Sequence, residues 1–387
     1  MIAKIFLITI FLLTLAPGLA LADALEYSWV PPSPPPADSQ LPEMISPPVP
    51  ALETVPAAPS SSWPLTPLPE LQDRPFGFTS PLAKVGWYVR GDAMFLHLSR
   101  NSTQPLAYDL IETTPGNSAT VIQSGPVITT NDLSSPNFSV VPRVTIGYQF
   151  DDRVSVEATY FGRNDWSGSA SAVSNPTGTP SVVYVESPDR LAWDKISTSL
   201  ASSVYSAEVN LFESFQSRPN LEFLGGLRYF GFTEQLRFNA EGTAAGNVYQ
   251  SAYNLNTVNN LYGAQVGLRW KHSWNRLSIV GTNKIGLYAN NASQEQFLGY
   301  AKNSNGVTVR DMSMFRPSLA FIQELGLNGT YQLTESCTIR GGYNLFVIGG
   351  LARASDQIDF STNPIPSMDA HGRAVLHGPS AGLEFRF

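Results

Sequence analysis

Apolar and polar residues alternate at every second position along most of the chain after residue 85. In "VSVEATY", residues 154–160, Val, Val, Ala and Tyr alternate with Ser, Glu and Thr. The segments "VTIGYQF", "SAEVNLF" and "LYGAQVGLRW" repeat this pattern. A period of two is typical of β-strands, because successive side chains point to opposite faces of a sheet. No helix-length stretch with a period of 3.6 residues is evident. The pattern predicts an all-β chain from residue 85 onward.

The links between the predicted strands alternate in length. Short links fall at residues 151–153, 213–220, 271–276 and 332–336, and long polar links at 99–137, 162–200, 239–257, 291–315 and 349–373. Bacterial outer-membrane barrels alternate short periplasmic turns with long extracellular loops. Five long and four short links predict a transmembrane, antiparallel up-and-down barrel of ten strands. Strand-like pieces at 119–130 and 181–187 could add a hairpin, so twelve strands is the alternative.

Each predicted strand has one apolar and one polar face. In a membrane barrel the apolar face, with residues such as Leu227, meets lipid, and the polar face lines the lumen. A soluble sheet shows the same alternation, so the pattern alone does not decide between them. The loop asymmetry, the export signal described next and an aromatic C-terminal residue favour the membrane barrel.

The N-terminal region predicts export. Residues 1–22 contain Lys4, an apolar run and the small-x-small site Ala20-Leu21-Ala22, as in a secretory signal peptide cleaved after Ala22. A retained membrane anchor is the alternative. Residues 23–84 are rich in proline, which favours extended polyproline II, and predict a disordered periplasmic linker. A peptide-recognition ligand is the alternative for this segment.

Composition narrows the functional classes. Charged residues make up 14% of the chain and the net charge is −7, which argues against nucleic acid as a partner. The single cysteine, Cys337, excludes an intramolecular disulfide. After the signal, no apolar run reaches the ~20 residues of a spanning helix.

Both signs of charge occur on the predicted inward faces. A barrel of about ten strands has a narrow interior that side chains fill. Unpaired buried charges are costly, so we expect ion pairs across the lumen and a plugged or tightly gated passage. The "RGD" of residues 90–92 fits such pairs better than an adhesion motif. The predicted lumen-lining residues are Arg90, Asp92, Arg143, Glu157, Glu208, Glu222, Arg228, Gln265, Arg269, Lys284, Glu324, Arg340, Glu384 and Arg386.

The sequence predicts no catalytic, cofactor-binding or metal-binding residue. The four histidines are scattered, and neither HExxH nor CxxC is present. An outer-membrane hydrolase would need His371 or His377 to act with Asp356, Asp369 or Ser380, and the spacing gives no support. The protein is therefore predicted not to be an enzyme.

The chain ends in "GPSAGLEFRF", which predicts the closing strand. It should pair with the first strand near residues 87–98, so that no strand edge faces lipid. The terminal Phe387 resembles the C-terminal aromatic residue by which barrel-assembly machinery recognises its clients. Outer-membrane lipid and this machinery are the expected partners.

Several stretches together resemble the putative beta-barrel porin-7 family, exported proteins found mainly in planctomycete bacteria. They are "WYVRGDAMFL", "FLGGLRYFGFTEQLRF", "NNLYGAQVGLRW", "NKIGLYANNA", "IRGGYNLFVIGGLARASDQI" and "LHGPSAGLEFRF". The resemblance spans about residues 85–387 and implies an outer-membrane barrel without a defined substrate. Residues that match the family pattern, most simply as barrel-building positions, are Asn259, Gly263, Gln265, Gly267, Asp356, Gln357 and Gly378.

These observations predict a porin-like channel for small solutes with a charged, gated lumen. The alternative is a structural or surface-interaction barrel without an open pore. A hydrolase is the remote third.

Overall fold

The structure is a computed structural model that describes residues 85–99, 103–113, 120–133, 138–174, 182–184, 193–244, 246–303, 305–360 and 367–387. The predicted signal peptide, residues 1–22, and the proline-rich segment, residues 23–84, lie outside the described residues. No helix in the described part of the chain is long and apolar enough to cross a membrane.

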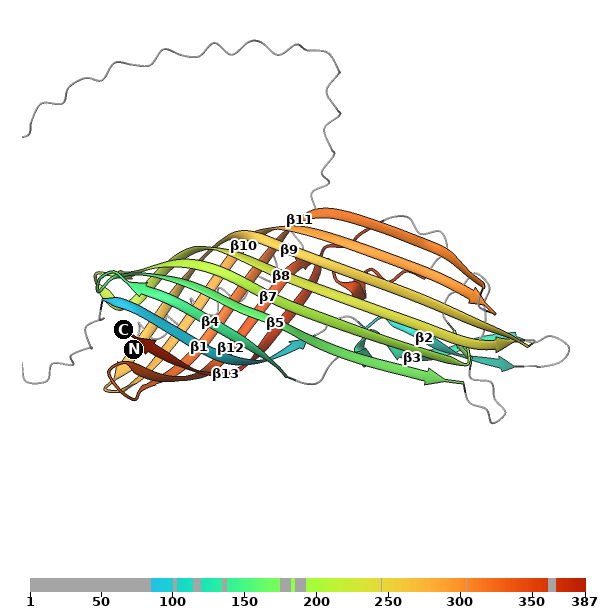
Figure 1. The fold of residues 1–387 in the computed structure, drawn as a ribbon, viewed down its shortest axis with the longest axis horizontal. Coiled ribbons are helices and arrows are strands. Elements are labelled where there is room, and N and C mark those ends of the chain that lie inside the picture. Colours follow the sequence, from blue (N-terminus) through green and yellow to red (C-terminus); the bar gives the residue numbers. More distant parts are fainter. Residues whose placement is uncertain are drawn as a thin grey trace, which may run out of the picture. The chain divides into compact units, whose positions relative to one another are not determined.

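Ten antiparallel strands form a closed barrel (Figure 1), as the link lengths predicted. Around the barrel they follow the order β1-β13-β12-β11-β10-β9-β8-β7-β5-β4, and β1 pairs with β4 to close it. The strands are β1 (Gly86–Ser99), β4 (Ser139–Gln149), β5 (Val154–Val173), β7 (Lys195–Phe215), β8 (Arg218–Ala244), β9 (Asn247–Trp274), β10 (Leu277–Lys302), β11 (Asn305–Gln332), β12 (Cys337–Leu351) and β13 (Gly372–Arg386).

The last strand closes the barrel against the first. Val89 pairs with Phe385 and Ala93 with Ala381, and the Phe387 N–H donates to the Trp87 carbonyl at 3.0 Å. The predicted closing strand is therefore confirmed.

The alternative of twelve barrel strands is wrong. The strand-like pieces form β3 (Thr120–Thr129) and β6 (Val182–Tyr184), which lie in a separate three-stranded sheet. Both pair with β2 (Pro105–Thr113), in the order β3-β2-β6, rather than with each other. A short 3-10 helix, η1 (Thr130–Leu133), follows β3.

Two of the five predicted long loops are also wrong, and a third, 162–200, is much shorter than predicted, because β5 runs to Val173 and β7 begins at Lys195. The structure continues the strands through most of residues 239–257 and 291–315: β8 ends at Ala244 and β9 begins at Asn247, and β10 ends at Lys302 and β11 begins at Asn305. Their outward residues are polar, which suggested loops, but inward residues such as Leu255 and Tyr253 are fully buried. Strands β7 to β11 are consequently 21 to 28 residues long, whereas β1, β4, β12 and β13 have 11 to 15.

The long strands extend beyond a membrane, since a transmembrane β-strand needs only ~9–11 residues. On β8 the outward face carries Phe223, Leu227 and Tyr229, and then changes to Thr233, Gln235 and Arg237. Leu227 is 70% exposed, as expected for a lipid-facing residue. We call the polar continuation of β5 and β7–β11 beyond this band the extracellular extension.

Aromatic residues border the apolar band on both sides, as in interfacial girdles. Near the short turns, Trp87 packs edge-on against Tyr148, and Tyr148 against Phe150. At the other border, the ring of Tyr229 lies between those of Tyr205 and Tyr262.

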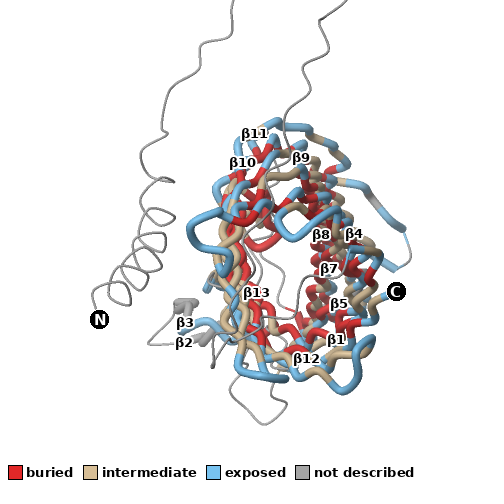
Figure 2. The backbone as a smooth tube through the Cα atoms, turned by 90° about the vertical axis from the view of Figure 1, so that its left-hand side faces the viewer, coloured by how far each residue is buried: buried red, intermediate tan, exposed pale blue. Residues whose placement is uncertain are grey.

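Buried residues occupy the inner face of the strands (Figure 2). One buried apolar cluster lies inside the barrel and includes Met94, Phe161, Phe230 and Phe346. A second lies on the inner face of the extracellular extension and includes Trp193, Phe238, Tyr253 and Leu298. The interior is therefore filled over both regions.

Candidate functional site: the occluded lumen

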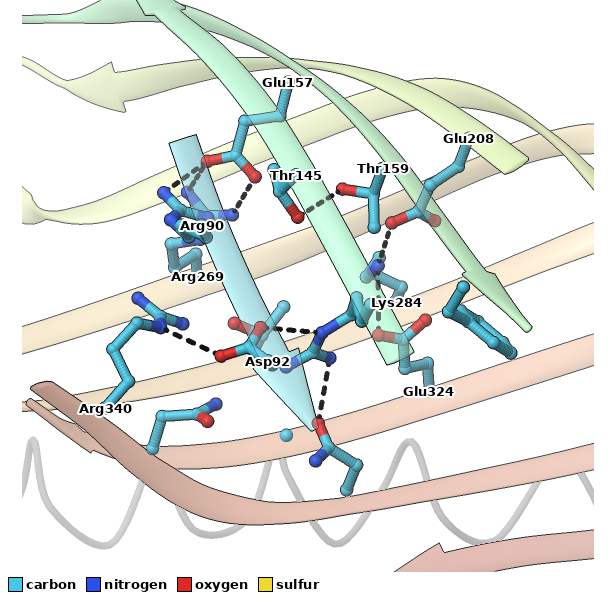
Figure 3. Close-up of a pocket in the computed structure, with 16 residues that line it drawn as sticks. Arg90, Asp92, Thr145, Glu157, Thr159, Glu208, Arg269, Lys284, Glu324 and Arg340 are labelled. Atoms are coloured by element: carbon cyan, nitrogen blue, oxygen red, sulfur yellow. Dashed lines mark hydrogen bonds and ion pairs between the residues drawn. The ribbon is translucent and has the colours of Figure 1, made fainter. Parts of the chain in front are cut away.

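Charged side chains from opposite walls meet in the lumen and form a layer of ion pairs (Figure 3). Glu157 on β5 is one centre of this layer. It accepts hydrogen bonds from the Tyr88 hydroxyl (2.8 Å), Arg90 Nη2 (2.9 Å) and both terminal nitrogens of Arg269 (2.9 Å each). Its partners lie on β1 and β9, so these bonds cross the barrel interior.

A second centre joins two carboxylates and two cations. Lys284 Nζ lies 2.7 Å from Glu208 Oε1 and 3.1 Å from Glu324 Oε1. Arg228 Nη1 lies 2.7 Å from Glu324 Oε2 and 3.7 Å from Glu208. Gln265 Nε2 donates to Glu208 Oε2 at 2.7 Å.

A third centre lies on β1, β4, β12 and β13. Asp92 Oδ2 accepts from Arg143 Nε at 3.0 Å, and Glu384 accepts from Arg90 Nε at 2.8 Å. Arg340 reaches both carboxylates at longer distances, 3.3 Å to Glu384 and 3.6 Å to Asp92. The "RGD" residues Arg90 and Asp92 are thus engaged in interior ion pairs.

The structure places thirteen of the fourteen predicted lumen residues in this layer through the contacts above and two more at its turn-side rim. They form two networks: the first and third centres share Arg90, and the second centre holds Glu208, Arg228, Lys284 and Glu324. Glu222 accepts from Arg269 (3.4 Å), and Arg386 donates to Glu384 (2.8 Å). The fourteenth, the uncharged Gln265, joins through Glu208. A cavity of about 70 Å³ lies between these groups. In the described conformation the ionic layer leaves no wide passage.

An aromatic layer, which sequence reasoning missed, lies next to the ionic layer. The Phe161 ring lies 6.3 Å from that of Phe230 and 5.4 Å from that of Phe346. The Arg228 guanidinium faces all three rings at 5.6–5.7 Å, so it joins the two layers by cation–π contacts. The sequence did contain a signal for this layer. Phe230 follows the inward residue Arg228 by two positions, and Phe346 follows the inward residue Asn344 by two positions, so both rings also point inward.

A segment between β12 and β13 enters the barrel interior. We call its described residues, 352–360 and 367–371, the plug; it includes the 3-10 helix η2 (Ala354–Asp356). At its start Gly350 has φ +83°, and an added Cβ would lie 2.3 Å from the Leu319 carbonyl oxygen. Only glycine fits such a conformation and contact without strain.

Side chains of the wall hold the backbone of the plug. Asn259 accepts from the Ala352 N–H (2.7 Å) and donates to its carbonyl (2.8 Å). Asn290 donates to both Asn259 and the Gly350 carbonyl, each at 2.9 Å. These asparagines are fully buried, which explains their polar character at inward positions.

A buried ion pair is the strongest anchor of the plug. Arg353 Nη2 lies 2.9 Å from Glu234 Oε1, with 2% and 0% of the two side chains exposed. The second Glu234 oxygen accepts from the Ala354 N–H at 2.9 Å. Sequence reasoning missed this pair because Arg353 lay in a predicted loop.

The plug is also tied to itself and to β11. Gln357 exchanges two hydrogen bonds with the backbone of Asp369, at 2.6 and 2.8 Å. Arg310 donates to the Asp359 carbonyl (2.8 Å) and Arg316 to the Met368 carbonyl. Burial raises the pKa of the Asp356 carboxyl, and the neighbouring Glu234 and Asp369 charges add to this effect.

The residues considered for a hydrolase are not brought together. His371 Nδ1 lies 2.8 Å from Asp369 Oδ1, but their side chains are 72% and 51% exposed. His377 bonds to the Tyr343 hydroxyl (2.7 Å), whereas Ser380 lies inside, bonded to Asn344 (2.9 Å). In the described part of the chain, no three His, Cys, Asp or Glu side chains are placed to share a metal ion.

A family model agrees with this architecture. The model described as putative beta barrel porin-7 matches residues 88–379. The chain belongs to this family. It is accordingly an outer-membrane β-barrel with a porin-like fold. In this porin-7 member Asn259 and Gln357 bond to the backbone of the plug.

No curated protein matches the sequence. Solved structures with a similar trace include the outer membrane protease OmpT from Escherichia coli, with 9% identity, a TM-score of 0.36, and coverage of 80% of this chain and 99% of that one. The translocator domain of the autotransporter NalP from Neisseria meningitidis has 9% identity and a TM-score of 0.33, covering 79% and 89%. The Pseudomonas putida toluene transporter TodX has 10% identity and a TM-score of 0.22, covering 79% and 90%. At these scores the likenesses carry no information about activity.

Proposed function

We propose that this porin-7 barrel is a gated channel for small solutes and that the described conformation is its closed state. The observation that carries the proposal is the plug, a segment that enters the lumen and is anchored by side chains of the wall. Release of the plug from the lumen would require breaking the Arg353–Glu234 ion pair and the hydrogen bonds of Asn259, while the strands of the barrel stay paired.

Opening would also require rearrangement of the layers below the plug. The ionic layer is polar and bears hydroxyl groups such as those of Thr145 and Thr159, which donate and accept hydrogen bonds as water does. The aromatic layer would act as a hydrophobic constriction, a type of gate that closes by excluding water. A lumen this narrow would pass only small solutes.

A structural barrel is the second candidate, and the filled interior favours it. The ionic layer, the aromatic layer and the plug together occlude the lumen, which suits a surface protein whose extracellular extension meets partners. We propose no enzymatic role, since the His371–Asp369 pair is exposed and Ser380 bonds inside the barrel to Asn344.

Planar-bilayer recording of the purified full chain separates the two candidates. The channel proposal expects rare, brief openings of the unaltered protein and frequent openings of the variant Glu234→Ala, because its plug loses the ion pair. The matched control is Glu213→Ala, since Glu213 pairs with Arg153 on the exposed turn side. Silence of all three proteins, each verified as folded, would favour the structural barrel.

We further propose that export involves cleavage after Ala22 and recognition of Phe387 by the barrel-assembly machinery. Phe387 is 81% exposed, so its ring contributes little to barrel packing and is available to a partner. The intact mass of the outer-membrane protein tests the cleavage site. Phe387→Ala should lower the amount assembled in cells without weakening the refolded barrel, and an equal loss in refolding would contradict recognition.

A further inference from the structure

The plug lies against the inward face of β10 on both sides of Gln294. Ala292, two residues before Gln294, belongs to the same buried apolar cluster as Ala352 of the plug. Gln296, two residues after it, donates to the Gln357 carbonyl of the plug at 3.3 Å. Side chains two residues apart on a strand share one face, so Gln294 lies between two contacts with the plug.

Gln294 and three neighbouring side chains have buried polar atoms without a hydrogen bond. Gln294 is 1% exposed, and neither its Oε1 nor its Nε2 has a partner among the described residues. Thr257, its pairing partner on β9, is fully buried with an unpaired hydroxyl. On the other side of Ala292, Asn290 of β10 pairs with Ser318 of β11, and Asn290 Oδ1 and Ser318 Oγ are likewise unpaired. We call these four residues the unpaired patch.

These unpaired atoms raise the free energy of the closed conformation. Most buried polar groups in proteins have a hydrogen-bond partner, and a group without one carries the full cost of leaving water. The atoms of the unpaired patch do not reach solvent while the plug is in place. Release of the plug uncovers the inner wall at Gln294, so water can then supply the missing hydrogen bonds.

Gln296 shows that the same side chain can pair at this wall. It is also an inward glutamine of β10 and is 5% exposed. Its Oε1 accepts from Arg310 Nη1 at 2.8 Å, and its Nε2 donates to the Gln357 carbonyl. Gln296 therefore stabilises the closed plug, whereas Gln294, two residues away, gains nothing from it.

We propose that the unpaired patch is a built-in bias toward release of the plug. Its polar atoms lose hydrogen bonds to water when the plug is seated and regain them when it leaves. The inference rests on the plug as the removable closure of the proposed function. It concerns release and not conduction, so silent bilayers would leave it intact.

Amide exchange of the full chain in two matched variants tests the proposal. Gln294→Met keeps an unbranched side chain of similar length and removes the unpaired amide. Exchange of residues 352–360, relative to residues 222–230 of β8, should then slow by about tenfold, because the closed state no longer contains an unsatisfied group. Gln296→Met removes the same amide where it is paired, so it should accelerate this exchange.

The opposite signs of the two effects decide the outcome. Unchanged or faster exchange in Gln294→Met would overturn the proposal, because it would show that the amide is satisfied in the closed state, for example by a buried water. Slower exchange in both variants would overturn it as well, since any apolar replacement would then tighten the plug.

Thr257→Val provides a second test that changes only a hydroxyl to a methyl group. It should also slow the exchange of residues 352–360, and it decides the question if Gln294→Met does not fold. Failure of Thr257→Val to fold would overturn the proposal, because the hydroxyl would then be needed in the closed state. Equal exchange of residues 352–360 and 222–230 in the unaltered protein would overturn both the bias and the removable plug, whereas the variants test the bias alone.

Discussion

The interior of this barrel is filled in two different ways. In the membrane-spanning part, the filling side chains belong to the wall itself, and they meet as ion pairs such as Glu157–Arg269. Beyond the apolar band, the space inside the long strands holds residues from the connecting segments. There Trp193, Leu106 and Ala354 pack against β8 and β9.

This difference indicates which of the residues that fill the lumen can leave it without unfolding the barrel. Wall residues are fixed by the barrel ladder, so they can change rotamer but cannot leave. The plug is attached to the ladder only at Leu351 and Gly372, and the pair Arg353–Glu234 holds its centre. We therefore expect the plug to leave the lumen by local opening, and the ionic layer to yield a passage only by changes of rotamer while the barrel ladder stays paired.

The largest effect should come from a charge placed in the apolar band, because this band defines the border between the membrane-spanning part and the extracellular extension. Leu227→Arg places a charge toward lipid, which costs up to ~2–4 kcal/mol near the bilayer midplane. The variant should fail to assemble into membranes, as measured by the folded band on unheated gels. Gln235→Arg, on the same face of β8 but in the extracellular extension, should assemble normally. Equal yields of the two variants would contradict the assigned border.

Glu157→Gln should destabilise the ionic layer without opening the lumen. Both Arg90 and Arg269 lose a buried carboxylate, and breaking a buried pair typically costs ~3–5 kcal/mol. The free energy of unfolding in denaturant should fall by about this amount. Conductance should stay at the level of the unaltered protein, since the aromatic layer and the plug remain. A steady open channel would show instead that the ionic layer alone closes the lumen.

Glu234→Ala should have the complementary effect. The variant leaves the buried Arg353 guanidinium without its carboxylate partner. The folded plug is therefore destabilised by up to ~3–5 kcal/mol, while the hydrogen bonds of the barrel ladder are unaffected. Amide exchange should accelerate in residues 352–360 and stay slow in the residues of β8 near Arg228. For comparison, Glu213→Ala removes an exposed pair worth about 0–1 kcal/mol and should change neither region. Acceleration over the whole barrel would argue against a separable plug.

The smallest effect concerns pH. Burial raises the pKa of Asp356 above its ordinary 3.8, so the folded plug favours the protonated carboxyl. The resulting stabilisation is complete below pH 3.8 and is lost as pH rises through the raised value. The exchange of residues 352–360, corrected for intrinsic rates, should therefore increase as the pH rises from 3.8 through the raised pKa of Asp356. Asp356→Asn should remove this dependence, and an unchanged pH profile in that variant would exclude Asp356 as its source.

The sequence predicts the barrel well because its main constraints are local. Lipid outside and a polar lumen inside impose a two-residue period, and the short turns "DDR" and "QLTES" set the strand count. The extracellular extension was mistaken for loops because it lies outside lipid. Its outward face is then polar, as at Gln235 and Asn239, so the apolar signal of a lipid-facing strand is missing there.

The site was predictable only in part, for a related reason. Inward charges such as Arg90 and Glu157 are visible in the strand pattern, but their pairing depends on strands far apart in sequence. Arg353 and Glu234 are separated by 119 residues, and no local period marks the entry of the plug into the lumen. Gly350 has φ +83° where the chain leaves β12, but the same strand contains Gly341, Gly342 and Gly349, so the residue type alone does not mark this position.

Hydrogen–deuterium exchange of the unaltered protein, followed by mass spectrometry, tests the central claim most directly. If the plug opens locally while the barrel ladder stays paired, peptides covering residues 352–360 will exchange orders of magnitude faster than peptides covering residues 222–230 of β8. Equal protection of the two regions would mean that the plug opens only with the barrel, and it would contradict the account of a removable closure.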